Sequence, residues 1–213
     1  MVLKRLVASG RKLGFPVLGV AAAVVLSGCA STTPTREVSS GYAVFDIKAG
    51  PEVTASRLAE AVKTSLQTRM TGVRIANNIP PSPLPEKAAR FKLASPFKGS
   101  GLEAIAAASG QSFQVPTCEG SILTANAADN SMSKYGEGTT FFACLMPYQG
   151  GYSLNVYTTF TKASGGFSAE ALGAALARTV VGDSSQFIPR TIGVLVDSIK
   201  ATGANVTLVE AYP

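Results

Sequence analysis

Residues 139–161 read TTFFACLMPYQGGYSLNVYTTFT, and this stretch carries the strongest fold signal in the chain. Its two halves, 139–148 and 151–161, are rich in the β-branched and aromatic residues that strands prefer. The turn between them, 149–151, is Gln-Gly-Gly, which is short enough to join two antiparallel neighbours. In the second half, one face collects four apolar side chains: Tyr152, Leu154, Val156 and Phe160. The stretch therefore predicts a β-hairpin with one apolar face.

Further strands are predicted on both sides of this hairpin. Residues 41–49 alternate, with Ala43, Phe45 and Ile47 on one face, and a Gly-Pro pair then ends the strand. The same pattern gives shorter candidate strands at 73–76, 90–94, 112–115, 121–127 and 204–212. Most of these segments alternate and do not run apolar throughout. Such alternation is typical of an antiparallel or mixed sheet in which one face is covered.

Four amphipathic segments are predicted as helices. The first follows an N-cap at Thr54 and repeats an apolar residue at every fourth position: Leu58, Val62, Leu66 and Met70. The second starts at a capping box, Ser100 with Glu103, and ends before Gly110. The third covers 168–180, and the fourth ends near Ala201 with Ile192, Leu195, Val196 and Ile199 buried. With the strands, they predict an α+β domain with about four helices packed mainly on one face of the sheet.

Composition and charge limit the possible functions. Of 213 residues, 46% are apolar and only 15% are charged, which suits a packed core. The net charge is +6, but without the first 28 residues the chain has 15 basic and 13 acidic residues, a net of +2. We therefore do not expect nucleic-acid binding, which needs a basic surface. No His is present, so Ser-His-Asp catalysis, Cys-His catalysis and imidazole metal sites are excluded. We expect no cofactor and no metal.

The N-terminus has the layout of a secretory signal. Four basic residues open it: Lys4, Arg5, Arg11 and Lys12. The apolar run that follows, 13–25, is shorter than the roughly 20 residues that span a bilayer, and it fits the apolar region of a signal peptide. This run leads into Leu26-Ser27-Gly28-Cys29. The combination resembles the lipobox of bacterial lipoproteins.

The resemblance implies that Cys29 is diacylated on its sulfur, that the peptide is cut before it, and that the new amino group is acylated. Ala30 follows, and the absence of Asp at the second mature position implies export to the outer membrane. We therefore expect a signal peptide at 1–28, a lipidated flexible tether at 29–41 and a single domain at 42–213. The expected location is the bacterial outer membrane, with the domain facing the periplasm. The lipid would be its contact with the membrane.

Two cysteines remain once Cys29 is lipidated. An even pair in an oxidising compartment predicts a disulfide between Cys118 and Cys144. Two buried free thiols are the alternative. A catalytic thiol is not expected, because no His can activate it and no Cys-x-x-Cys is present.

Several short motifs match sequence patterns of enzymes but lack the neighbouring elements or partner motifs that these enzymes need. Ser-x-x-Lys occurs at 95–98 and 131–134, but neither copy begins a good helix and no partner motif of serine acyltransferases is present. Gly-x-Gly-x-x-Ala at 99–104 matches a nucleotide-binding loop, although the capping box already explains these residues. We therefore expect no catalytic residues and no enzymatic activity.

Two predicted surface features each allow two interpretations. A basic run without an intervening acid could face anionic lipid or glycan, or be an ordinary solvated face: Lys87, Arg90, Lys92 and Lys98. Four prolines within 77–87 indicate either a polyproline-II docking strip or a solvated connector. The likeness of 48–58 to 162–172, each a strand end leading to a capped helix, leaves an internal duplication open.

Three functions compete on this evidence. The first is a non-enzymatic structural or docking component of an envelope assembly, with an envelope protein as partner. The second is a binding module for a small envelope ligand, a lipid or a peptidoglycan fragment. The third is a Ser-Lys hydrolase. An apolar cavity over the hairpin would favour the second function, and a continuous exposed apolar or polyproline surface would favour the first.

Overall fold

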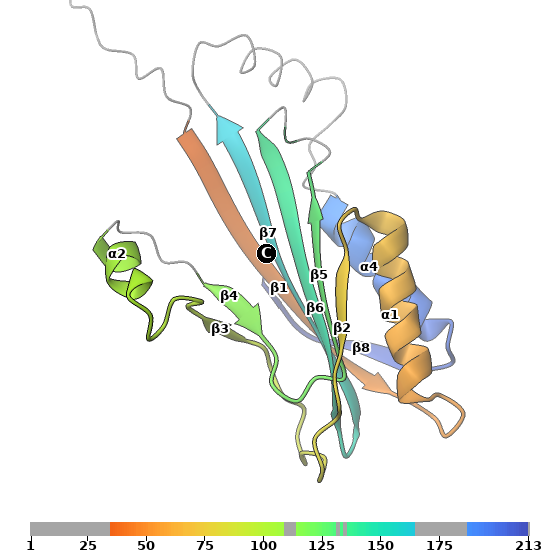
Figure 1. Ribbon diagram of the computed structural model, residues 1–213. Helices are drawn as coiled ribbons and strands as arrows, with labels where there is room; N and C mark the ends of the chain where they lie inside the picture. The colour runs from red at the N-terminus through yellow and green to blue at the C-terminus, as the bar shows by residue number, and fades with distance from the viewer. Residues whose placement is uncertain (1–34, 109–113, 131–132, 134–135, 165–186, 213) are drawn as a thin grey trace, which may run out of the picture. The chain divides into compact units, whose positions relative to one another are not determined.

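The computed structural model describes residues 35–108, 114–130, 133, 136–164 and 187–212, which all belong to one unit, Ser31–Pro213. Six strands form an antiparallel sheet in the order β2-β5-β6-β7-β1-β8 (Figure 1). These strands are β1 (Thr35–Lys48), β2 (Arg74–Asn77), β5 (Leu123–Asp129), β6 (Glu137–Tyr148), β7 (Gly151–Ser164) and β8 (Asn205–Tyr212). A separate antiparallel pair consists of β3 (Lys92–Ala94) and β4 (Val115–Thr117). The helices are α1 (Ala55–Arg69), α2 (Leu102–Ala108) and α4 (Phe187–Lys200).

The predicted α+β class and its antiparallel sheet are confirmed. The described residues contain three helices where about four were expected, and the helix predicted at 168–180 lies outside them. Two of the three, α1 and α4, pack on the same face of the sheet (Figure 1). The third, α2, leaves Leu102 and Ile105 54% and 65% exposed, so it does not add to that layer. None of the described helices is long and apolar enough to cross a membrane.

The predicted hairpin is confirmed as β6 and β7. Leu145 lies opposite Leu154, and the strands close with Tyr148 opposite Gly151. Gly151 has φ +141°, and a Cβ at this position would collide with the carbonyl oxygen of Ile47 on β1. Glycine is therefore needed here for two reasons, the backbone angle and the close approach of a neighbouring strand.

Strand β6 is buried on both of its faces. Phe141, Ala143 and Leu145 belong to the core under the helices. Cys144 and its neighbours two residues away, Phe142 and Met146, form a second buried cluster on the opposite face. We expected one covered face, and the uninterrupted apolar run 141–147 instead reflects cover on both sides.

The helical layer follows the predicted periodicity. Thr54 accepts a hydrogen bond from the Arg57 backbone N–H at 3.2 Å, which confirms the N-cap of α1. Fully buried side chains of α1 are Leu58, Val62 and Leu66. In α4, Leu195 and Ile199 are fully buried, whereas Ile192 and Val196 are only half-buried. Pro189 lies in the first turn of α4, where a missing N–H is tolerated.

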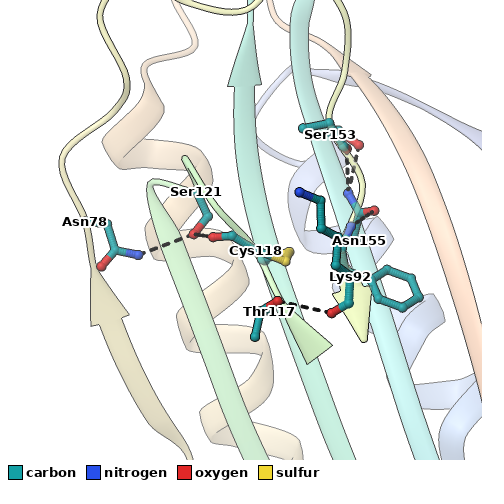
Figure 2. Close-up of a disulfide and its surroundings, with 10 residues drawn as sticks. Asn78, Lys92, Thr117, Cys118, Ser121, Ser153 and Asn155 are labelled. Atoms are coloured by element: carbon teal, nitrogen blue, oxygen red, sulfur yellow. Dashed lines mark hydrogen bonds between the residues drawn. A yellow bond between two sulfur atoms is a disulfide. The ribbon is translucent and has the colours of Figure 1, made fainter. Parts of the chain in front are cut away.

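Part of the second face of the sheet is covered by the described residues of 78–121, which we call the arm. Phe91 of the arm packs against Tyr42 and Tyr157, with ring centroids 5.6 and 5.5 Å apart. The fully buried Asn155 of β7 accepts from the Phe91 N–H at 3.3 Å and donates to Ser153 at 2.9 Å (Figure 2). These contacts hold the arm on the sheet.

Strand β1 begins earlier than predicted. Residues 35–41 were expected in the flexible tether, but they pair with the last residues of β7, beginning with Thr35 opposite Ser164. Residues 35–40 are polar except for Val38, and they lack the alternation of apolar and polar residues that predicts a strand. Pairing with β7 supplies its hydrogen bonds, so the chain is extended here without an apolar face.

Candidate functional site

The predicted disulfide is present. Cys118 of the arm is bonded to Cys144 of β6, with the two Cα atoms 6.4 Å apart (Figure 2). Close to Cys118, the Ser121 hydroxyl donates to the Cys118 carbonyl at 3.0 Å and accepts from the Asn78 amide at 3.3 Å (Figure 2). The bridge therefore ties the arm to the centre of the sheet. Cys29, the predicted lipidation site, lies outside the described residues.

The predicted basic patch is partly paired with carboxylates. The Arg90 guanidinium lies 2.6 Å from a Glu210 carboxylate oxygen, and the Lys92 ammonium lies 3.4 Å from a Glu119 carboxylate oxygen. Lys87 and Lys98 form no ion pair with another described residue. The two ion pairs lower the net positive charge available to an anionic surface, and binding by these four residues remains a prediction.

The enzyme-like motifs have local structural roles where they are described. The Phe97 N–H donates to the Ser95 hydroxyl at 3.3 Å in a turn. The Gly99 N–H donates to the Glu103 carboxylate at 2.8 Å, so the loop's own acid takes the donor that a phosphate would use. The second Ser-x-x-Lys copy, Ser131 with Lys134, lies outside the described residues. Among the described residues, no cluster of acids and cysteines could hold a metal ion.

The candidate site is an apolar groove between α4 and the sheet, which we call the α4 groove. It encloses about 810 Å³, a size typical of small-ligand sites. Its α4 wall consists of Ile188, Pro189, Ile192, Gly193 and Val196. Its sheet wall comes from β1, β7 and β8 and includes Gly41, Ala43, Phe45, Phe160, Leu208 and Ala211. The remaining lining residues are polar or aromatic: Ser39, Ser40, Tyr42, Thr158, Asp197 and Tyr212.

The sequence explains why this groove exists. The residues Ile188, Ile192 and Val196 repeat at every fourth position and form a second apolar stripe on α4, beside the buried stripe of Leu195 and Ile199. The buried stripe packs into the core, while the second stripe lines the groove. We did not predict the groove from the sequence, although the two apolar stripes of α4 indicate it. A helix that packs on the core with a single face needs only one apolar stripe, so a second stripe points to a second apolar surface.

A polar cluster lies beside the groove. Tyr42 stacks on Tyr212 with ring centroids 6.0 Å apart, and both residues contribute to the groove lining, while the Tyr42 ring packs against Phe91 on the arm side of the sheet. The Tyr42 hydroxyl donates to Glu210, which also accepts from Arg90 of the arm. These two donors, Tyr42 first, lower the pKa of the Glu210 carboxyl, and the same carboxylate raises the pKa of Tyr42. The cluster fastens the arm to the edge strand β8.

No family model, curated protein or solved structure matches this chain.

Proposed function

We propose that this protein is a non-enzymatic lipoprotein of the bacterial envelope that binds an acyl chain of an envelope lipid in the α4 groove. The observation that carries the proposal is the groove itself. Burying a chain of CH₂ groups against its apolar walls contributes about 0.8 kcal/mol per group. The few polar groups of the lining suit the head end of such a ligand better than its chain.

The N-terminal signal supports a lipid as the ligand. Five residues separate Cys29 from the first residue of β1, Thr35, so a fully extended connection spans at most about 22 Å. Ser39 and Gly41, which line the groove, follow within the same strand. An acylated Cys29 would hold this part of β1 close to a membrane and hence close to acyl chains. The outer membrane is the location that the lipobox implies.

A groove-filling variant tests the ligand. Gly193 lines the groove, and a Cβ at this position would meet nothing within 4 Å. In Gly193→Trp the indole should occupy the groove without disturbing the helix, since replacing a helical glycine also favours the helix. Gly50→Trp is the matched control, because Gly50 also has open space around it and does not line the groove.

The measurement is native mass spectrometry of the full-length lipoprotein extracted from membranes in detergent. We expect the wild type and Gly50→Trp to retain one phospholipid in addition to the covalent lipid, and Gly193→Trp to retain none. Equal retention by Gly193→Trp and the wild type, or no lipid in the wild type, would contradict the proposal. Cys29→Ser tests the anchor separately, because the thioether needs sulfur: we expect an uncleaved precursor without lipid.

Docking on an envelope assembly is the second candidate function. Among the described strands, the edge strand β8 has β1 as its single neighbour, and Val209 and Tyr212 on it are 56% and 61% exposed. Open, apolar edges pair readily with other strands. Val209→Lys should then remove a crosslinked partner protein from intact cells while lipid retention stays unchanged. A partner protein that is crosslinked equally well by Val209→Lys and the wild type would count against docking at β8.

A further inference from the structure

A second hollow lies on the opposite face of the sheet from the α4 groove. Four side chains form one row across neighbouring strands, because Arg74 pairs with Asn126, Asn126 with Phe142, and Phe142 with Tyr157. In the next row, the hydroxyls of Thr140 and Thr159 are hydrogen-bonded to each other. The register therefore places a guanidinium, an amide, two aromatic rings and two hydroxyls side by side.

The arm turns this polar row into a trough. Residues 114–116, at the start of β4, line it together with the row and with Asn130. The enclosed volume is about 620 Å³, which is again typical of small-ligand sites. Arg74 and Asn126 are exposed, and Tyr157 is half-buried. Arg74 forms no ion pair with another described residue, so its guanidinium is available to a ligand.

We propose that this trough binds a saccharide that carries a carboxylate. Amide and hydroxyl groups both donate and accept, which matches the hydroxyl and acetamido groups of a sugar. The half-buried Tyr157 ring offers apolar area next to these polar groups, which matches the apolar face of a sugar ring. The Arg74 guanidinium matches a carboxylate in charge and in its two-pronged geometry. A purely apolar ligand would instead bury Arg74 and Asn126 without partners, at a considerable cost.

The N-terminal signal narrows the source of the saccharide. A lipoprotein facing the periplasm meets the glycan strands of peptidoglycan, whose muramic acid residues carry a free lactyl carboxylate wherever the stem peptide has been removed. The trough and the α4 groove lie on opposite faces of one sheet, so the two ligands do not compete for space. This inference does not depend on lipid binding in the groove.

Two disaccharides and the full-length lipoprotein in detergent micelles provide the test. The first probe is N-acetylglucosaminyl-N-acetylmuramic acid, and the second is di-N-acetylchitobiose, which lacks the lactyl carboxylate. Dissociation constants come from saturation-transfer NMR titrations. We expect the acidic probe to bind more tightly than chitobiose, since only the acidic probe reaches Arg74 with a carboxylate.

Two trough variants and one control variant identify the site. Arg74→Gln should weaken binding of the acidic probe by about 10-fold and leave chitobiose unchanged. Asn126→Asp places a carboxylate opposite Arg74 with little change in size, and it should also weaken the acidic probe. Arg69→Gln, an exposed arginine at the end of α1, is the control and should change neither.

Three outcomes would overturn the proposal. One is that the wild type binds neither disaccharide. Another is that Arg74→Gln and Arg69→Gln bind the acidic probe equally well. The third is that Arg74→Gln weakens chitobiose as much as the acidic probe. Because Arg74 and Asn126 are exposed, both variants should keep the wild-type unfolding temperature, which checks that they fold.

Discussion

Asn155 shows how a single buried polar residue positions a whole segment. Its side chain is completely buried in the middle of β7, where an apolar residue would be expected. The amide accepts from the Phe91 N–H, donates to Ser153 and lies 3.5 Å from the Ala89 carbonyl. A buried amide is tolerated only when its partners are present, so Asn155 fixes where the arm crosses the sheet.

Thr191 is the opposite case, a buried polar group without a partner. Its hydroxyl forms no hydrogen bond with any described residue, although the side chain is only 2% exposed. We predict that Thr191→Val raises the free energy of unfolding by about 1 kcal/mol, because the shape is kept and the unpaired hydroxyl is removed. Thr202→Val is the control, and it should lower the free energy of unfolding, because the Thr202 hydroxyl donates a hydrogen bond to the Ile199 carbonyl at 2.6 Å. Urea unfolding of both variants measures the difference.

The Tyr42–Glu210 pair gives the protein a pH dependence. The Tyr42 hydroxyl and then Arg90 lower the pKa of Glu210. The pair therefore stabilises the fold above the ordinary pKa of a carboxyl group, and this contribution is lost as the pH falls through the lowered pKa. We predict that Tyr42→Phe raises the pKa of Glu210 and makes stability less sensitive to acid. NMR titration of the Glu210 carboxyl carbon in both proteins measures this pKa. An equal pKa of Glu210 in Tyr42→Phe and the wild type would contradict the prediction.

At the scale of the elements, β6 is the centre of the molecule. One face of it contacts the core under α1 and α4, and the other contacts the arm. The arm itself has only three-residue strands, β3 and β4, and an exposed short helix, α2. It buries few apolar side chains of its own, so its position depends on Phe91, Asn155 and the disulfide.

We therefore predict that removing the disulfide affects the arm first. In the chain-entropy description, the bridge between Cys118 and Cys144 contributes about 3–4 kcal/mol. The double variant Cys118→Ala/Cys144→Ala should unfold at lower urea concentration, and hydrogen exchange should accelerate in the arm more than in β1 and β7. Uniform acceleration across all strands would show instead that the arm and the sheet open as one unit.

At the scale of the whole molecule, the tether is shorter than the sequence predicts. Residues 35–41 belong to β1, so the connection between Cys29 and the sheet consists of 30–34. If Cys29 is lipidated as proposed, this short connection would hold the sheet closer to the membrane than a flexible tether that extends to residue 41. This shortening brings the β1 part of the α4 groove closer to the expected anchor.

A truncation series tests the role of this part of β1. A chain that starts at Thr35 should fold and unfold cooperatively, because it keeps all of the described core. A chain that starts at Ala43 loses Tyr42 and its contacts with Phe91 and Tyr212. We expect its free energy of unfolding to fall by about 1–3 kcal/mol for these two ring contacts alone. Equal values for the two chains, measured in urea, would mean that this part of β1 is dispensable.

Neighbouring residues in the chain are enough to predict much of the local structure of this protein. The Gln-Gly-Gly turn, the Thr54 cap and the alternation around Phe45 depend on neighbouring residues, and each appears where it was predicted. The Cys118–Cys144 pair was also predictable, because a simple count left only these two. Turn chemistry, capping and periodicity act over a few residues, so they can be inferred without the fold.

Long-range contacts, in contrast, set which surfaces of the sheet are covered and which stay open. The polar start of β1 becomes a strand because β7 extends alongside it, and β6 is buried twice because the arm folds back over it. The α4 groove is lined jointly by α4 and the sheet, and the trough is lined jointly by the arm and the sheet. Such hollows arise from contacts between residues far apart in the chain, and periodicity within one element carries no information on where its neighbours end.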